Sequence, residues 1–208
     1  MTKPKFRMLK SRYYEENVPL VALDYYDRDS HGEDDFSRKQ VWFYTYGDKE
    51  IEKRFREDLG AVFRKLFSED GLDWDMITLY PAHAEGTLNT HMMSLVLDVA
   101  GDVGIPVEQV IRRTETVSQN HEIEKEKAKV VNLEGSLEVL QDLEGKNVIL
   151  VDNIVLSGVS MLNGASTLKK RGAENVFSIS LGTSRKHQEE TQELNEDATA
   201  LDLIQARE

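Results

Sequence analysis

Residues Asp152–Ser160 bring an acid, an amide and two serines together around a glycine, a set of groups that suits a phosphorylated sugar. The segment follows the apolar run Val148–Val151 and precedes a helical pattern, a junction that commonly holds a phosphate in α/β proteins. Gly158 lets the backbone approach the anion closely, and the serine hydroxyls donate hydrogen bonds to it. Asp152 can accept hydrogen bonds from vicinal ribose hydroxyls or hold Mg²⁺ through water.

A simpler interpretation of the same residues is structural. Asp152 and Asn153 would turn the chain, and Ser160 would cap the following helix. The position of the segment, after a buried strand and before a helix, favours the phosphate site instead.

The elements that must position this segment alternate between two types. Apolar or β-branched segments predict strands over residues 19–25, 41–46, 76–80, 107–111, 147–151 and 176–181. Apolar residues at three- and four-residue steps predict helices over residues 48–67, 90–103 and 162–171. The alternation predicts an α/β fold with a doubly wound, mostly parallel sheet and a small N-terminal β appendage made by the first two strands. Ligands of such sheets bind at the carboxyl ends of the strands.

Two segments carry no clear core pattern. Residues 118–130 are highly charged, which predicts a mobile loop or an exposed helix. The tail after Arg185 is mostly acidic and polar, and predicts at best a marginal surface helix.

The composition excludes several classes of protein. The chain has 208 residues, 39% of them hydrophobic and 31% charged, which is enough to bury the core of one domain. It has no cysteine, so disulfides and thiolate metal sites are excluded, and a cytoplasmic location is expected. A net charge of −12 argues against broad nucleic-acid binding. With no apolar run of membrane-spanning length and no signal-like N-terminus, no membrane association is expected, and a homodimer is the expected assembly.

The neighbouring segments extend the pattern of the phosphate loop. Val148–Ser160 resembles the phosphoribosyl-pyrophosphate (PRPP) loop of type I phosphoribosyltransferases, and the resemblance points to the ComF-like branch of that family. It covers roughly residues 41–185. The other segments similar to motifs of that branch are Arg112-Arg113-Thr114, Ser118-Gln119, Asn132–Leu137 and Tyr46-Gly47-Asp48.

The resemblance implies a phosphoribosyltransferase fold and an enzyme that transfers ribose 5-phosphate from PRPP to a nitrogenous base, releases pyrophosphate and uses Mg²⁺. It divides the chain into a hood-like appendage (1–45), a core (46–185) and an acidic tail (186–208). The site residues that it implies are Asp152 and Asn153 for catalysis at the ribose, with Asp152 also holding the metal through water; Leu156, Ser157, Gly158, Val159 and Ser160 for the phosphate; Pro81, Ala82, His83 and Ala84 for the pyrophosphate; and Gln119, Lys125 and Lys127 in a flexible lid.

Three departures from the family pattern support a second hypothesis. Asn153 stands where the family has a second acid, and Leu156 stands where it has a threonine. The loop over residues 81–91 contains no Lys or Arg. The alternative is therefore a non-catalytic protein of this fold that binds a nucleotide or sugar phosphate in a regulatory or DNA-uptake-related role.

Several basic residues near the expected site remain undecided between a ligand and a surface role. Arg112 or Arg113 could reach a phosphate or pair with Glu115 at the surface. The lysines of residues 125–129 fit a lid or a solvated charged face. His83 and His91 could add charge toward pyrophosphate, but an ordinary polar role is favoured for both.

Overall fold

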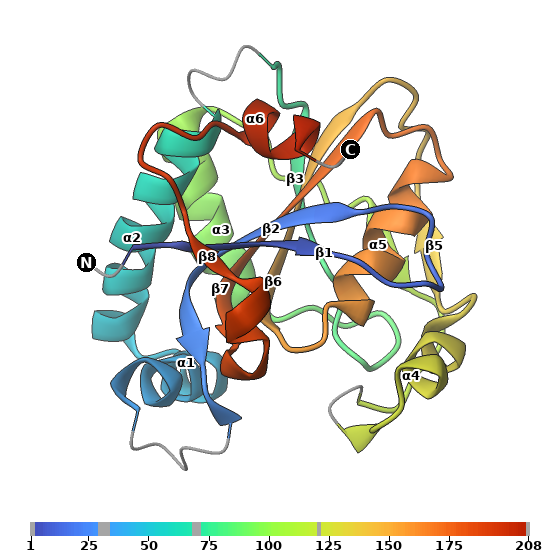
Figure 1. The fold of residues 1–208 in the computed structure, drawn as a ribbon, viewed down its shortest axis with the longest axis horizontal. Helices are drawn as coiled ribbons and strands as arrows, with labels where there is room; N and C mark the ends of the chain where they lie inside the picture. Colours follow the sequence, from blue (N-terminus) through green and yellow to red (C-terminus); the bar gives the residue numbers. More distant parts are fainter. Residues whose placement is uncertain (1–2, 29–33, 68–71, 120–121, 207–208) are drawn as a thin grey trace.

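The computed structural model describes residues 3–28, 34–67, 72–119 and 122–206, and strands and helices alternate through most of them (Figure 1). The strands are β1 (Lys5–Leu9), β2 (Val18–Tyr26), β3 (Met76–Leu79), β4 (Ile111–Arg113), β5 (Leu137–Val139), β6 (Asn147–Val155), β7 (Asn175–Ser184) and β8 (Gln192–Glu193). The α-helices are α1 (Asp35–Tyr46), α2 (Lys49–Phe67), α3 (Thr90–Val103), α4 (Glu126–Leu133), α5 (Val159–Lys169) and α6 (Ala200–Gln205), and Arg185–Glu190 form a 3₁₀ segment, η3.

Within the described residues, six strands form the central sheet in the order β3-β6-β7-β2-β1-β8. The neighbours from β3 to β2 are parallel, whereas β1 is antiparallel to both β2 and β8. β4 and β5 form a separate antiparallel ribbon. The predicted α/β fold with a mostly parallel, doubly wound sheet is therefore confirmed.

Helices cover both faces of the sheet because the buried strands alternate their side chains between two cores. In β6, Ile149 and Val151 belong to the core that contains α2, α3 and α6, whereas Val148 and Leu150 belong to the core that contains α5. In Figure 1, α2 and α3 accordingly lie on one side of the sheet and α5 on the other. This double cover explains why residues 148–151 are uniformly apolar.

The predicted strand over residues 41–46 is wrong, because this segment is the second half of α1. Asp34 caps the helix by accepting a hydrogen bond from the Ser37 amide at 2.8 Å. At the other end, Gly47 has a φ of 65°, and its amide bonds to the Phe43 carbonyl. Phe43 is fully buried against Phe55. The two caps and this contact outweigh the strand preference of the aromatic residues.

Other boundaries also differ from the sequence expectations. The predicted strand over residues 107–111 is mostly irregular: Val107 makes one isolated bridge to Ile77, and β4 begins only at Ile111. The buried strand expected to end at Val151 continues to Val155. Of the two options for residues 118–130, an exposed helix is observed from Glu126 onward.

The acidic tail is more ordered than its composition predicts. β8 pairs with β1, and α6 begins with a capping box between Thr199 and Asp202. Ala200, Leu203 and Ile204 are buried in the α2–α3 core, so the expectation of at most a surface helix is wrong. The N-terminal strands expected to form a separate appendage, β1 and β2, are hydrogen-bonded into the central sheet. The division at residues 45 and 185 stays a prediction.

We expect Gly47→Ala to lower the free energy of unfolding by about 2 kcal/mol. A Cβ at this position would overlap the His91 ring, and the backbone conformation is left-handed. Gly86→Ala is the matched control, because Gly86 also has a φ of 65° but nothing lies within 4 Å of its Cβ position. Urea unfolding of both variants should show the larger loss for Gly47→Ala; equal losses would mean that the contact with His91 adds nothing.

Candidate functional site

The carboxyl ends of β3 and β6 carry two hollows that share Asp152 and Ser160. β3 ends at Leu79, opposite Val151, while β6 continues beside β7 to Val155, so the last residues of β6 extend beyond β3. The first hollow, of about 170 Å³, is lined by Pro81, Ala82 and His83 and is called the Pro81 hollow. The second, of about 160 Å³, is called the Ser157 hollow and is lined by Lys129, Asp152, Ile154, Val155, Leu156, Ser157, Gly158, Ser160 and Met161.

The Ser157 hollow has the groups of an anion site. Gly158 precedes α5 with a φ of 86°, a conformation that turns the chain sharply from β6 into the helix. The first-turn amides of α5 have no partners within the helix, and the helix dipole favours negative charge there. Four of the five predicted phosphate residues line this hollow; the exception is Val159, which is buried in a small apolar cluster with Val117 and Leu133.

Asp152 occupies the junction of the two hollows. Burial raises its pKa to about 7, against the opposing effects of a hydrogen bond from the Asn153 amide and of the positive charge of Arg113. The amide bond, from Asn153 N to Asp152 Oδ1, is 2.8 Å long. Near neutral pH the carboxyl group is therefore divided between its protonated and ionised forms. Asn153 lines the Pro81 hollow beside it.

Arg113, which the sequence left undecided, is buried with an exposed fraction of 2% and lines the Pro81 hollow. Its Nε donates to the Ala82 carbonyl at 2.7 Å, Nη1 donates to Ser136 Oγ at 2.7 Å, and Nη2 donates to the Tyr80 hydroxyl at 3.0 Å. These bonds hold a positive charge against a loop that itself contains no Lys or Arg.

Arg112, the neighbour of Arg113, is exposed and forms an ion pair of 2.8 Å with Glu138 on β5, not with Glu115. The side chains of β4 alternate between the two sides of the ribbon, so only one of the two arginines can face the site. Their adjacent positions could not show which one.

The hydroxyl of Tyr80 connects the Pro81 hollow to α5. Burial raises the pKa of Tyr80, with smaller opposing effects from Arg113, so the phenol stays protonated. The Tyr80 hydroxyl bonds to Asn163 Oδ1 at 3.5 Å and also contacts Ser160. One buried network thus joins Arg113 to the start of α5.

The predicted pyrophosphate loop is held in place by backbone contacts. The His83 carbonyl accepts a hydrogen bond from the Val117 amide at 3.0 Å, and the Ala84 carbonyl accepts one from Thr87 Oγ1 at 2.8 Å. Pro81, Ala82 and His83 line the hollow, whereas Ala84 does not. His91 packs against the Phe43 ring, which is consistent with an ordinary structural role.

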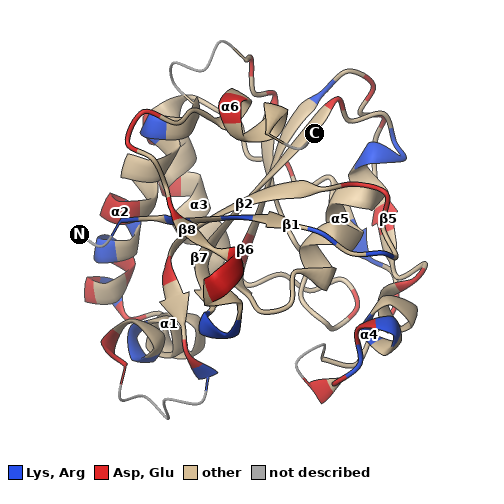
Figure 2. Ribbon diagram, in the orientation of Figure 1, with Lys and Arg blue, Asp and Glu red and all other residues tan. Residues whose placement is uncertain are grey.

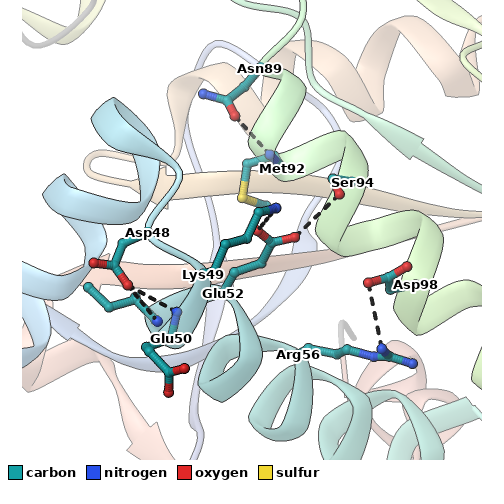
Figure 3. A network of polar contacts seen from close by, with 10 residues as sticks. Asp48, Lys49, Glu50, Glu52, Arg56, Asn89, Met92, Ser94 and Asp98 are labelled. Carbon is teal, nitrogen blue, oxygen red and sulfur yellow. Dashed lines mark hydrogen bonds and ion pairs between the residues drawn. The ribbon is translucent and has the colours of Figure 1, made fainter.

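Asn89 links this loop to the helix layer. Its side chain caps α3 by accepting a hydrogen bond from the Met92 amide at 2.8 Å (Figure 3). Asn89 and Met92 both line the Pro81 hollow. Glu52 on α2 accepts hydrogen bonds from Lys49 at 2.6 Å and from Ser94 on α3 at 3.3 Å. Figure 3 shows both contacts; the first lies within α2, and the second joins α2 to the first turns of α3 beside the site.

The predicted lid residues do not come together. Gln119 lines the Pro81 hollow, but Lys125 and Lys127 are exposed and line neither hollow. Lys129 lines the Ser157 hollow instead. Tyr44 of α1 also lines the Pro81 hollow, and sequence reasoning missed it because the segment was expected to be a strand.

No group of three or more metal-binding side chains occurs in the described part of the chain. Mg²⁺ is commonly held by one or two carboxylates together with water and substrate phosphates. Asp152, at the junction of the hollows, fits that type of site.

The helices carry charges of both signs: in Figure 2, basic and acidic residues are mixed along α2 and α4. None of the described helices is long and apolar enough to cross a membrane.

The doubly wound, mostly parallel sheet with this pair of hollows at its carboxyl edge places the protein among the α/β proteins that bind ligands at the carboxyl ends of their strands. Residues 87–207, more than half of the chain, match the family model described as the phosphoribosyl transferase domain. The chain belongs to this family.

Individual relatives are distant. A ribose-phosphate pyrophosphokinase from Pyrococcus furiosus is 26% identical over 126 residues, which are 57% of this chain and 45% of the relative, so the chain spans less than half of that protein. The glutamine PRPP amidotransferase from B. subtilis, solved with ADP and GMP, is 17% identical over 68% of this chain and 30% of that one, with a TM-score of 0.45. An adenine phosphoribosyltransferase is 17% identical over 72% and 79% of the two chains, with a TM-score of 0.47.

Proposed function

We propose that this protein is a PRPP-binding phosphoribosyltransferase of ComF-like type, which transfers ribose 5-phosphate to a nitrogenous base and releases pyrophosphate. The pair of hollows that share Asp152 and Ser160 carries the proposal. PRPP has a phosphate at one end, a ribose in the middle and a pyrophosphate at the other end. Two hollows that meet at a carboxyl group suit that order, with one anionic group in each hollow and the ribose between them.

Each part of PRPP has proposed partners in the site. Leu156–Ser160 would bind the 5′-phosphate through amides and hydroxyls, and Asp152 would accept hydrogen bonds from the ribose hydroxyls. The loop of Pro81–His83 would bind the pyrophosphate, and Arg113 behind it would supply the positive charge that the loop lacks. The lid role of Gln119, Lys125 and Lys127 stays a prediction.

The reaction needs positioning and charge stabilisation more than covalent chemistry. A nitrogen of the base would attack C1 of the ribose while the bond from C1 to the pyrophosphate oxygen breaks. Pyrophosphate would leave with the bonding electrons, and the proton of the attacking nitrogen would pass to the departing pyrophosphate or to water. Arg113 would stabilise the charge that develops on the leaving group. Asp152 would hold Mg²⁺ through water, and the ion would neutralise part of the pyrophosphate charge.

A non-catalytic role is the second candidate, and Asn153 favours it. An amide at this position brings no negative charge to stabilise the positive charge that develops on the ribose during the transfer. A protein that keeps a phosphate-binding loop but has this amide would bind a nucleotide or sugar phosphate without turning it over.

We expect Asn153→Asp to raise the rate of pyrophosphate release from PRPP by at least about tenfold, because it restores the missing charge beside the ribose. The measurement is a coupled pyrophosphate assay with Mg²⁺ and a panel of purine and pyrimidine bases. Asn195→Asp adds the same charge at an exposed position of the tail and should leave the rate unchanged.

The two candidate functions give different outcomes in this assay. Pyrophosphate release by the wild-type protein with one of the bases would support the enzyme. If neither the wild type nor Asn153→Asp releases pyrophosphate, while both bind nucleoside monophosphates in calorimetry, the non-catalytic role is favoured. Absence of binding to PRPP and to every monophosphate would contradict both.

A further inference from the structure

Arg7 of β1 lies behind the phosphate loop as a buried cation. Its exposed fraction is 3%, and its Nη2 donates a hydrogen bond of 3.0 Å to the Leu156 carbonyl. Its Nε is also buried and has no hydrogen-bond partner among the described residues. Burial lowers the pKa of Arg7 to about 10, and the charge of Glu190 opposes this shift only in part. An incompletely compensated cation therefore lies against this loop.

Lys129, on α4, lies at the same loop although it is far from Arg7 in the sequence. It lines the Ser157 hollow together with Ser157 and Ser160, and its side chain is partly buried. Burial lowers the pKa of Lys129, and Glu126 one turn earlier opposes the shift. Among the described residues, Glu126 acts on the ammonium group of Lys129 through its charge, and none forms a hydrogen bond or ion pair with it.

The placement of Lys129 depends on the N-terminal hairpin. Ser11, in the turn between β1 and β2, donates a hydrogen bond of 2.6 Å to Glu126 at the start of α4. Tyr14 from the same turn packs with Val130 against a small cluster that contains Leu133. The hairpin that carries Arg7 therefore also holds the helix that carries Lys129.

The charges of both cations also act on His187 in η3. Burial lowers the pKa of His187 in η3, and the positive charges of Arg7 and Lys129 both lower it further. Glu190 acts in the opposite direction and lies 3.1 Å from His187 Nδ1. Two cations from distant parts of the chain thus lie at one loop, in a protein whose net charge of −12 repels anions.

We propose that Lys129 is a direct ligand of the phosphate group bound at Leu156–Ser160, and that Arg7 is a positioning residue that holds the loop from behind. The proposal rests on the assignment of this loop to the 5′-phosphate. The ammonium group would add a charge-assisted hydrogen bond to those from the amides and hydroxyls. Arg7 lies outside residues 87–207, so this part of the site comes from beyond the matched family domain.

The test is calorimetric titration with ribose 5-phosphate and with inorganic phosphate, at about 50 mM and about 200 mM salt. Lys129→Ala should weaken ribose 5-phosphate binding by at least about tenfold and reduce the dependence of affinity on salt. Lys53→Ala, which removes an exposed lysine of α2, is the charge-matched control and should bind like the wild type. Equal affinities of Lys129→Ala and Lys53→Ala would overturn the role of Lys129.

Arg7 requires two variants, because loss of a buried side chain can impair folding. Arg7→Met should weaken phosphate binding by about tenfold, and Arg7→Lys, which keeps the charge, should recover most of the loss. If Arg7→Met does not fold, Arg7→Lys must still bind more weakly than the wild type, because lysine cannot reproduce the geometry of the bond to Leu156. If Arg7→Met folds and binds phosphate with wild-type affinity, the positioning role is overturned. If Arg7→Met does not fold, wild-type affinity in Arg7→Lys overturns it.

These outcomes are separable from failure of the proposed function. If the wild-type protein binds neither ribose 5-phosphate nor inorganic phosphate, the loop is not a phosphate site, and both proposals fall. If the wild type binds and Lys129→Ala binds equally well, only the present inference falls.

Discussion

Arg113→Met is expected to lower the free energy of unfolding by about 4 kcal/mol and to remove measurable PRPP binding. Methionine can fill much of the volume but cannot donate to Ala82, Ser136 or Tyr80, the three partners of the guanidinium. The Ala82 carbonyl and the hydroxyls of Ser136 and Tyr80 then each lose the hydrogen bond donated by the guanidinium, in a buried or partly buried position. The predicted pyrophosphate loop also loses the bond that holds the Ala82 carbonyl. Chemical unfolding and calorimetric titration with PRPP measure the two effects.

Arg112→Met is the matched control for this experiment. Arg112 is adjacent in sequence and carries the same charge, but its ion pair with Glu138 is exposed, with side-chain exposures of 57% and 44%. Removing such a pair should change stability by less than about 1 kcal/mol and leave PRPP binding intact. Arg113→Lys should recover little, because an ammonium group cannot reach three acceptors in a planar arrangement. Similar losses for the Arg112 and Arg113 variants would show that the network contributes nothing specific.

Asp152→Asn is expected to have opposite effects on stability and on binding. The pKa of this carboxyl group is raised to about 7 in the folded protein, so folding favours its protonated form. The penalty for ionising it is absent at low pH, develops as the pH rises from about 4 to about 7, and is complete above that range. Removing the titratable group should therefore stabilise the protein at about pH 8, by about 2 kcal/mol after allowance for partial solvent access, and should have little effect at about pH 4.

The same substitution should weaken PRPP binding by about tenfold to a hundredfold at about pH 8, because an amide is a poorer acceptor for ribose hydroxyls than a carboxylate. Thermal unfolding at the two pH values and titration with PRPP are the measurements. A gain in stability together with a loss of binding is typical of a residue retained for function.

Asp75→Asn provides a control of opposite sign. Although burial acts to raise the pKa of Asp75, hydrogen bonds from Lys146 and from the Asn147 amide lower it overall. Its ionised form therefore favours folding at neutral pH, and the substitution should lower the melting temperature at about pH 8 more than at about pH 3. If Asp152→Asn also destabilised the protein at about pH 8, the buried carboxylate would not be the unfavourable group that its pKa indicates.

The fold was largely predictable because its strongest signals are local. The buried strand at residues 148–151 and the amphipathic helix α2 each carry a periodicity that depends only on neighbouring residues. The same reasoning failed for α1, where Trp42 and Tyr44 have high strand preference. Caps at Asp34 and Gly47 and the contact of Phe43 with α2 determine its helical state. It failed again for the tail, because the apolar residues of α6 are buried against α2 and α3, which are distant in the sequence.

The same distinction between local signals and long-range contacts applies to the candidate site. The sequence by itself determined the local strand–loop–helix unit that carries the predicted phosphate loop and Asp152, because these segments are continuous in the chain. Only the tertiary structure decided which cations join them. It placed Arg113 in the interior and Arg112 at the surface, and it brought Arg7 and Lys129 to one loop across 122 residues of sequence. A charge has no periodicity to reveal its partner, and its role depends on the burial and the neighbours that the packed sheet and helices provide.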